Sequence, residues 1–234
     1  MMKKYFLAVT LLASSVVALS QESHMYIKGG VNAANITVDK NGTYHDANTV
    51  ISFHAGLGAD LPLAKCLSIQ PSLLFTGKGA RTSSGSTTGT NPSYVEGKFN
   101  PYYVELPVNL VGKIPLAMEE SNFFIGAGPY IAMGVAGKTK TQGKVFGAAF
   151  EHKGDIKFSN DDPTTTNYEE DAGFGTIKRF DYGLNGTAGF QFNSIMISAN
   201  YGYGLAKIVG GTNSNNTDDK NKYRVWSLSL GIRL

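Results

Sequence analysis

The stretch Tyr102-Tyr-Val-Glu-Leu-Pro-Val-Asn-Leu-Val111 decides the fold of this chain, because apolar side chains recur along it at every second position. One side carries Tyr102, Val104, Leu106, Val108 and Leu110, and the other carries Tyr103, Glu105 and Asn109. Successive side chains of a β-strand point to opposite faces, so the stretch is predicted to be a strand with one apolar and one polar face. Its length matches the roughly 9–11 residues that a tilted strand needs to cross a membrane.

Seven further runs of the chain are strand-like. They are Met25–Ala34, Val50–Asp60, Cys66–Gly77, Asn122–Ala136, Phe180–Asn193, Ile195–Ile208 and Tyr223–Leu234. The alternation recurs in every run from Val50 onward; in the last run, Trp226, Leu228 and Leu230 oppose Ser227 and Ser229. An even number of such runs can close into a ring of antiparallel strands.

The gaps between the runs alternate in length. Those after the first, third, fifth and seventh runs are long and rich in Gly, Ser, Thr, Asn and Asp, whereas the other three are short. Antiparallel neighbours joined in this way place all long loops at one end and all short turns at the other, as in transmembrane β-barrels. The predicted fold is therefore all-β: an eight-stranded antiparallel meander barrel with short periplasmic turns and long extracellular loops.

The long gap Gly137–Arg179 leaves the strand number open. Its pieces Lys144–Phe150 and Asp155–Phe158 can extend the fifth and sixth strands as a hairpin above the membrane, or they can add a strand pair and give ten strands. The extension is favoured because both pieces are short and weakly patterned. Three prolines inside the runs, Pro71, Pro107 and Pro129, lack the donor N–H of a strand and predict local bulges.

Alternation alone does not say which face points outward. A lipocalin-like carrier would hold its apolar face inside, around a ligand. The outward direction is favoured because the polar face is built of small residues and amides, which suit the tight interior of an eight-stranded barrel. Aromatic residues near the run ends also suit interfacial girdles: Tyr102, Phe123, Tyr182, Phe192, Tyr203 and Trp226.

Residues 1–20 are predicted to be a signal peptide, which leaves residues 21–234 as the barrel domain. Lys3 and Lys4 precede a short apolar stretch, and Ala18 and Ser20 take the small positions of a cleavage site. Removing both lysines lowers the formal charge from +3 to +1, which gives no reason to expect nucleic acid as a partner. The single cysteine, Cys66, excludes an intrachain disulfide.

The polar faces supply the candidate lumen residues, to which a structural role is assigned. They are Lys28, His54, Gln70, Glu105, Asp181, Asn185 and Arg233. An unpaired charge in a narrow lumen is costly, so Glu105 is expected to pair with Lys28 or Arg233. With Tyr103 and Tyr130 also inside, the lumen is predicted to be plugged.

No pattern of catalytic, cofactor-binding or metal-binding residues stands out. The stretch from Ala132 to Thr139 fits a relaxed phosphate-loop pattern, but no helical periodicity follows it. The carboxylates around residues 161–171 fit no calcium loop, and the four histidines are dispersed and form no zinc-binding pair. The sequence therefore predicts a non-enzymatic protein without a cofactor or a metal.

The chain resembles the PorT-like outer-membrane β-barrel family of Gram-negative bacteria from about Tyr26 to Leu234. The resemblance is carried by Leu61-Pro-Leu63, Leu67-Ser-Ile-Gln-Pro-Ser-Leu-Leu-Phe-Thr-Gly-Lys-Gly79, Tyr103-Val-Glu-Leu-Pro107, Gly126-Ala-Gly-Pro-Tyr130, Phe180-Asp-Tyr-Gly-Leu-Asn-Gly186, Tyr201-Gly-Tyr-Gly-Leu205 and Leu228-Ser-Leu-Gly-Ile-Arg-Leu234. It implies a barrel in the outer membrane but no particular chemistry.

The predicted function is a structural role, or a surface-interaction role through the long loops. The expected partners are outer-membrane lipid, the barrel-insertion machinery and a surface protein or glycan. Two alternatives remain open: a secreted lipocalin-like carrier of small ligands, and an outer-membrane hydrolase. Detergent dependence separates the membrane barrel from the carrier.

Overall fold

The computed structural model describes residues 23–37, 47–86, 93–118, 120–145, 148–158, 176–208 and 221–234, and none of these residues is helical. The strands, in chain order, are β1 (His24–Ile36), β2 (Ala47–Asn48), β3 (Val50–Ala64), β4 (Leu67–Gly77), β5 (Ala80–Ser86), β6 (Ser93–Pro115), β7 (Ser121–Val145), β8 (Ala148–Asp155), β9 (Lys157–Phe158), β10 (Thr176–Ile177), β11 (Phe180–Phe192), β12 (Ile195–Gly204) and β13 (Tyr223–Arg233). The predicted signal peptide lies outside the described residues. In the part of the chain that is described, no helix has the length and apolar character that a membrane crossing requires.

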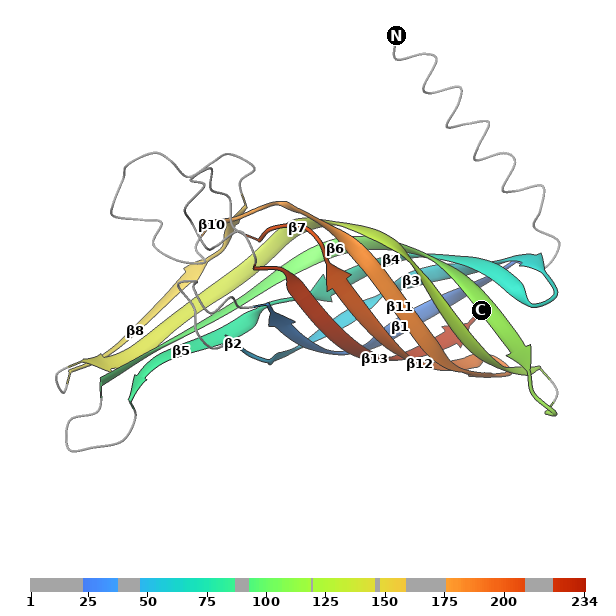
Figure 1. Cartoon of the computed structure of the whole chain (residues 1–234), viewed down its shortest axis with the longest axis horizontal. Coiled ribbons are helices and arrows are strands. Elements are labelled where there is room, and N and C mark those ends of the chain that lie inside the picture. The colour runs from blue at the N-terminus through green and yellow to red at the C-terminus, as the bar shows by residue number, and fades with distance from the viewer. Residues whose placement is uncertain are drawn as a thin grey trace, which may run out of the picture.

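Eight strands close into an antiparallel ring in the order β1, β3, β4, β6, β7, β11, β12 and β13 (Figure 1). The ring is completed where β13 pairs with β1. The connections after β3, β6 and β11 are short, and they lie at the same end as the C-terminus. The predicted eight-stranded barrel, with its short turns gathered at one end, is confirmed.

The two longest strands continue past the ring at the opposite end. There β5 pairs with the first part of β6, and β7 runs on to Val145 before returning as β8. These four segments form a sheet that projects from the barrel (Figure 1). Within the described segments, β8 pairs with β7 and with no other strand, so the ring keeps eight strands rather than ten. The sixth membrane strand, β11, is not extended: it begins at Phe180, so the predicted hairpin is made by β7 and β8.

The predicted bulges at the three in-strand prolines are absent from the structure's register, and this prediction is wrong. Pro71 in β4 lies opposite Val108 in β6, and pairing resumes at Leu74 opposite Glu105 with the same offset. A proline removes one ladder bond, and here regular pairs on either side keep the strand in line. The register shifts lie instead between Pro62 and Ala64 and between Tyr102 and Tyr103.

The apolar faces of the ring strands point outward. Their exposed side chains include Ile27, Val31, Ile51, Leu57, Leu73, Leu106, Val108, Leu110, Ile125, Ile131, Leu184, Ile197, Leu228 and Leu230. An uncovered apolar belt of this size needs lipid around it. The predicted orientation is confirmed, and the lipocalin-like alternative, which requires an apolar interior, is wrong.

Aromatic rings gather at both ends of this belt. Toward the projecting sheet, the Tyr102 ring stacks on that of Phe75, with centroids 5.3 Å apart, and contacts Phe53 at 5.8 Å. Toward the short turns, the Phe190 ring lies 5.2 Å from that of Phe123. These two groups have the positions of interfacial girdles and mark where the barrel leaves the hydrocarbon.

Candidate functional site

A buried lysine, Lys78, lies in the part of the lumen nearer the projecting sheet, which we call the upper lumen. Lys78 follows β4, and its ammonium nitrogen Nζ is 2.6 Å from Oε2 of Glu105 on β6 and 2.7 Å from Oδ2 of Asp181 on β11. Lys78 and Asp181 are each only 3% exposed. A buried charge is tolerated only when it is paired and hydrogen-bonded, so these three side chains tie together three separate strands of the wall.

Tyrosine rings surround the ammonium group. Lys78 Nζ lies 4.3 Å from the ring centroid of Tyr130, 5.3 Å from that of Tyr103 and 5.7 Å from that of Tyr223. The hydroxyl of Tyr130 donates to Asp181 Oδ2 at 3.1 Å, and the hydroxyls of Tyr103 and Tyr223 are hydrogen-bonded at 3.2 Å. Cation–π attraction therefore adds to the ion pairs.

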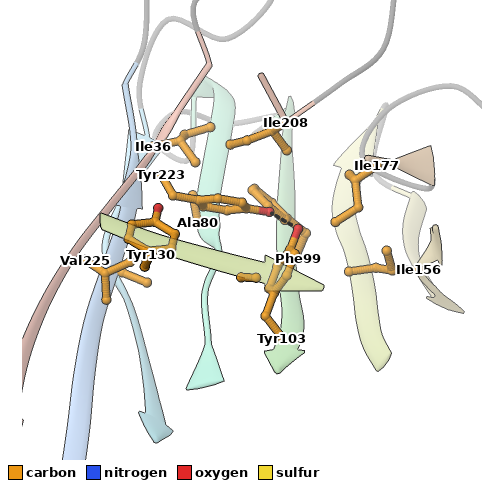
Figure 2. Close-up of a cluster of buried hydrophobic side chains, with 12 residues drawn as sticks. Ile36, Ala80, Phe99, Tyr103, Tyr130, Ile156, Ile177, Ile208, Tyr223 and Val225 are labelled. Carbon is orange, nitrogen blue, oxygen red and sulfur yellow. Dashed lines mark hydrogen bonds between the residues drawn. The ribbon is translucent and has the colours of Figure 1, made fainter. Parts of the chain in front are cut away.

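A buried apolar cluster that includes these three tyrosines closes the lumen toward the projecting sheet, and Figure 2 shows its side chains. It joins inward-facing residues of the wall to short segments beyond the ring: Ala34, Ile36, Ala80, Phe99, Tyr103, Tyr130, Ala132, Ile156, Ile177, Ile208, Tyr223 and Val225. The side chains come from β1, β5, β6, β7, β10 and β13, together with Ile156 and Ile208 outside the strands, so they meet from different parts of the wall and from beyond it. This packing separates the lumen from the outside.

Below Lys78 the lumen is filled by a hydrogen-bonded amide and imidazole network. The His54 ring donates from Nδ1 to Asn32 Oδ1 at 2.7 Å, and its Nε2 lies 2.8 Å from the Ser229 hydroxyl. Asn200 also donates to Ser229, and it accepts from Lys28 Nζ at 3.2 Å. Both ring nitrogens of His54 are therefore occupied by structural partners, which leaves neither free for acid–base chemistry.

Near the short-turn end, the polar layer is completed by an ion pair between Lys113 and Asp60. Gln70 also donates to Asp60, at 3.3 Å. The remaining internal space is small. One cavity of about 40 Å³ lies beside Lys28 and Glu105, and another of about 20 Å³ lies nearer the turns. Cavities of this size hold only a few water molecules, so they form no continuous channel.

The structure places the predicted lumen residues at two levels. His54, Gln70 and Asp181 are buried inside, and Lys28, Glu105 and Asn185 line the 40 Å³ cavity. Arg233 lies at the short-turn rim, where it pairs with Glu120 at 2.9 Å. The expected pairing of Glu105 with Lys28 or Arg233 is wrong: Lys78 is the partner. Its backbone N–H, just past the end of β4, donates to Pro101, and its side chain extends along the lumen to Glu105.

Lys78 is the central residue that sequence reasoning missed, although the sequence carries a signal for it. Ser68, Gln70, Ser72 and Thr76 form the polar face of the third run, and the same alternation reaches Lys78 two residues later. The predicted run ends at Gly77, as β4 does, so Lys78 just beyond it was assigned to neither face.

Four of the sequence pieces that carry the family resemblance meet at this cluster. Lys78 belongs to the piece that ends at Gly79, Glu105 to Tyr103–Pro107, Tyr130 to Gly126–Tyr130 and Asp181 to Phe180–Gly186. They are far apart in the sequence and adjacent in space. These four of the seven pieces therefore meet at the Lys78 cluster, which ties the strands of the wall together.

Among the described residues, no group of three histidine, cysteine, aspartate or glutamate side chains could hold a metal ion. The two positive charges of Lys28 and Lys78 are matched by the two negative charges of Glu105 and Asp181. A larger hollow of about 760 Å³ opens at the short-turn end, but its charged lining residues include the Lys113–Asp60 and Arg233–Glu120 pairs.

Comparison with known proteins adds a family match. The model of the family described as "Outer membrane protein beta-barrel domain" matches residues 19–210. A search of curated proteins finds no match. Among solved structures, the attachment invasion locus protein Ail of Yersinia pestis is 18% identical, with 92% of this chain and 100% of that chain covered and a TM-score of 0.40. Neisserial surface protein A is 12% identical, with coverage of 90% and 96% and a TM-score of 0.40.

Proposed function

This chain belongs to the family of outer membrane protein beta-barrel domains and lies in the outer membrane, and from that premise we propose that it is a non-enzymatic surface scaffold. In this function the plugged barrel anchors the protein, and the projecting sheet of β5 to β8 meets a surface protein or glycan. A rigid scaffold that carries exposed loops is a common arrangement for recognition.

The observation that carries the proposal is the excess length of two strands. β6 has 23 residues and β7 has 25, more than twice the roughly 9–11 residues that a membrane crossing requires. The excess is ordered by pairing with β5 and β8 rather than left as a loop. A structural anchor alone has no need of this sheet beyond the membrane.

The sheet has an apolar feature suited to a contact. Phe150 on β8 is 43% exposed, and Val95 on β6 is 39% exposed. Both lie in one row across the sheet, on either side of Gly143 of β7. A Cβ added at Gly143 would stand 2.9 Å from the Phe150 ring, so this glycine allows the ring to lie close to the strand.

Several further parts of the proposal rest on the sequence. Residues 1–20 are the signal peptide, residues 21–234 form the mature barrel, and the barrel-insertion machinery and outer-membrane lipid are its partners during assembly. We propose the finer PorT-like assignment on the motif pieces that meet at Lys78. The lumen residues Lys28, His54, Gln70, Glu105, Asp181, Asn185 and Arg233 have structural roles.

Removal of the projecting hairpin is expected to abolish the surface contact without unfolding the barrel. Thr139 and Gly154 are opposite each other across β7 and β8, so residues 140–153 can be replaced by an Asn-Gly turn, which favours a hairpin. The measurement uses intact cells, with a photo-crosslinking residue for protein neighbours at position 95, which the deletion keeps, or at position 148 in the undeleted protein. A glycan array is used for the purified protein. The control is the same crosslinker at Lys65, at the short-turn end. Equal crosslinking or glycan binding with and without the hairpin would disprove the proposed contact.

The lumen is expected not to conduct. The apolar cluster above Lys78 and the polar layers below it, as far as the described residues form them, leave small separate cavities, so purified protein in planar bilayers should show no steady current. A Tyr103→Ala, Tyr130→Ala, Tyr223→Ala variant, which removes the rings around Lys78, is the comparison and should leak. Steady large-conductance channels from the wild type would show that the lumen is open.

A further inference from the structure

One side of the projecting sheet continues the lipid-facing surface of the barrel. Tyr102 points outward with the girdle, and the even-numbered residues before it on β6 share its side. The opposite side includes Phe99, which is 1% exposed and belongs to the apolar cluster that closes the lumen. Lys98, on the same side as Tyr102, therefore faces away from the barrel axis.

A bulge in the neighbouring strand β7 turns its lysine side chains to the same side of the sheet as Lys98. Tyr103 lies opposite Gly134, but Tyr102 lies opposite Ala136, so Val135 is an extra residue on β7. An extra residue reverses the alternation of a strand beyond it. Outward positions on β7 are odd-numbered below the bulge and even-numbered above it, which turns Lys138 and Lys140 outward beside β6.

Four cations then occupy one row across the outer side of the sheet. Arg81 on β5 lies opposite Lys98 on β6, Lys98 opposite Lys140 on β7, and Lys140 opposite Lys153 on β8. Like charges placed directly opposite each other destabilise a sheet. A row of four is therefore unfavourable for the protein alone and becomes favourable when anions lie over it.

The carboxylates of this surface neutralise only part of the row. Glu96 pairs with Arg81 at 2.8 Å. Glu151 pairs with Lys153 at 2.8 Å and with Lys140 at 3.1 Å. Hydrogen bonds from Lys153 and Lys140 lower the pKa of Glu151, so this carboxylate stays ionised and is shared between two lysines.

Three lysines of the outer side, Lys98, Lys138 and Lys144, have no carboxylate within ion-pair distance among the residues that the structure describes. The third carboxylate on this side, Asp155, is opposite Lys138 in the register but forms no such pair within that part of the chain. The outer side thus carries six cations and three carboxylates: Arg81, Lys98, Lys138, Lys140, Lys144 and Lys153 against Glu96, Glu151 and Asp155.

The height of the row fits the headgroup layer. Lys98 is four residues from Tyr102 of the girdle, and a strand that rises about 3.3 Å per residue at a tilt of about 45° lifts it roughly 9 Å above that ring. Acyl chains packed on the apolar belt would therefore end at Tyr102, and their headgroups would lie against the cations.

We propose that the outer side of the β5–β8 sheet binds the phosphate groups of an outer-leaflet glycolipid, whose acyl chains lie on the belt below. Lysine and arginine donate charge-assisted hydrogen bonds to phosphate oxygens. The glycolipid is chosen over a protein partner because the cationic row continues the lipid-facing surface without a break. This inference goes beyond the proposed surface contact, since Phe150 and Val95 lie on the opposite side of the sheet.

The test uses full-length protein in nanodiscs of neutral phosphatidylcholine doped with lipid A. Native mass spectrometry, after gentle detergent release, measures the retained lipid A. Each basic residue near an anionic surface contributes about fivefold in affinity, so Lys98→Gln, Lys138→Gln, Lys140→Gln together are expected to lower retention at least tenfold. The matched control removes the same kind of charge elsewhere, by Lys65→Gln and Lys178→Gln, and should keep wild-type retention.

Two further binding measurements distinguish the phosphate groups of a lipid from free phosphate in solution. Dephosphorylated lipid A should be lost from the wild type as readily as lipid A is lost from the triple variant. Free pyrophosphate, titrated into lipid-free detergent solution, should bind at least tenfold more weakly than lipid A. The proposal is overturned if the triple variant, folded as judged by Trp226 fluorescence, retains as much lipid A as the wild type does. It is also overturned if the wild type retains dephosphorylated lipid A as well as it retains lipid A, or if free pyrophosphate binds as tightly as lipid A. Loss of lipid A with unchanged crosslinking from position 148 would separate this inference from the surface contact.

Discussion

Lys78→Met is expected to lower the free energy of unfolding by about 3–5 kcal/mol, because it leaves two buried carboxylates in the lumen without a counter-ion. Glu105 and Asp181 each lie within 2.7 Å of the Lys78 ammonium nitrogen, and methionine offers neither a charge nor a donor. The measurement is guanidinium unfolding of the detergent-folded barrel. Trp226, the only tryptophan, lies 61% exposed on the outer surface and reports the loss of the apolar environment.

Two controls make the Lys78 result specific. The triple change Lys78→Met, Glu105→Gln, Asp181→Asn removes every charge of the cluster and should recover much of the loss, since replacing a whole buried ion pair costs less than breaking it. Lys113→Met breaks the partly exposed pair with Asp60 at the short-turn end and should cost less. A Lys78→Met barrel as stable as the wild type would show that the carboxylates are neutral or solvated.

Leu106→Arg is expected to destabilise the barrel by about 2–4 kcal/mol, because arginine on the lipid face near the membrane midplane must leave water. Leu106 is 41% exposed on the outer surface of β6, between the two aromatic girdles. The measurement is the same unfolding experiment, carried out in lipid vesicles so that the depth of the side chain matters.

The matched control places the same substitution at the edge of the belt. Leu63 is 45% exposed near the turn after β3, and Leu63→Arg should cost only about 0–1 kcal/mol because the guanidinium reaches the interface there. Asn109→Ser, on the lumen side of β6, should also be mild. If Leu106→Arg and Leu63→Arg have equal effects, Leu106 does not face the hydrocarbon.

The alternation of Tyr102, Val104 and Leu106 against Tyr103 and Glu105 was enough to predict the strand and which residues share a face, since these are local properties of an extended chain. The direction of the faces was predicted from the small and amide residues of the polar face and from the aromatic residues near the run ends. The lengths of the gaps predicted the ring and its two unlike ends. The prediction failed at Pro71, where a missing N–H leaves the register unchanged, since the regular pairs on either side hold the strand in line.

The sequence by itself determined which residues face the lumen and which face lipid. The period of two sorted the residues into two faces, and the small and amide residues of the polar face indicated which face is inside. The sequence could not determine which lumen charges meet. Glu105 was expected to pair with Lys28 or Arg233, but the side chain of Lys78 reaches Glu105 along the lumen and Arg233 lies at the rim. The outer cationic row is likewise invisible in the sequence, since Arg81, Lys98, Lys140 and Lys153 align only through three strand registers and the extra residue Val135. Contacts between distant segments depend on register around a closed ring, and register is set by the tertiary structure.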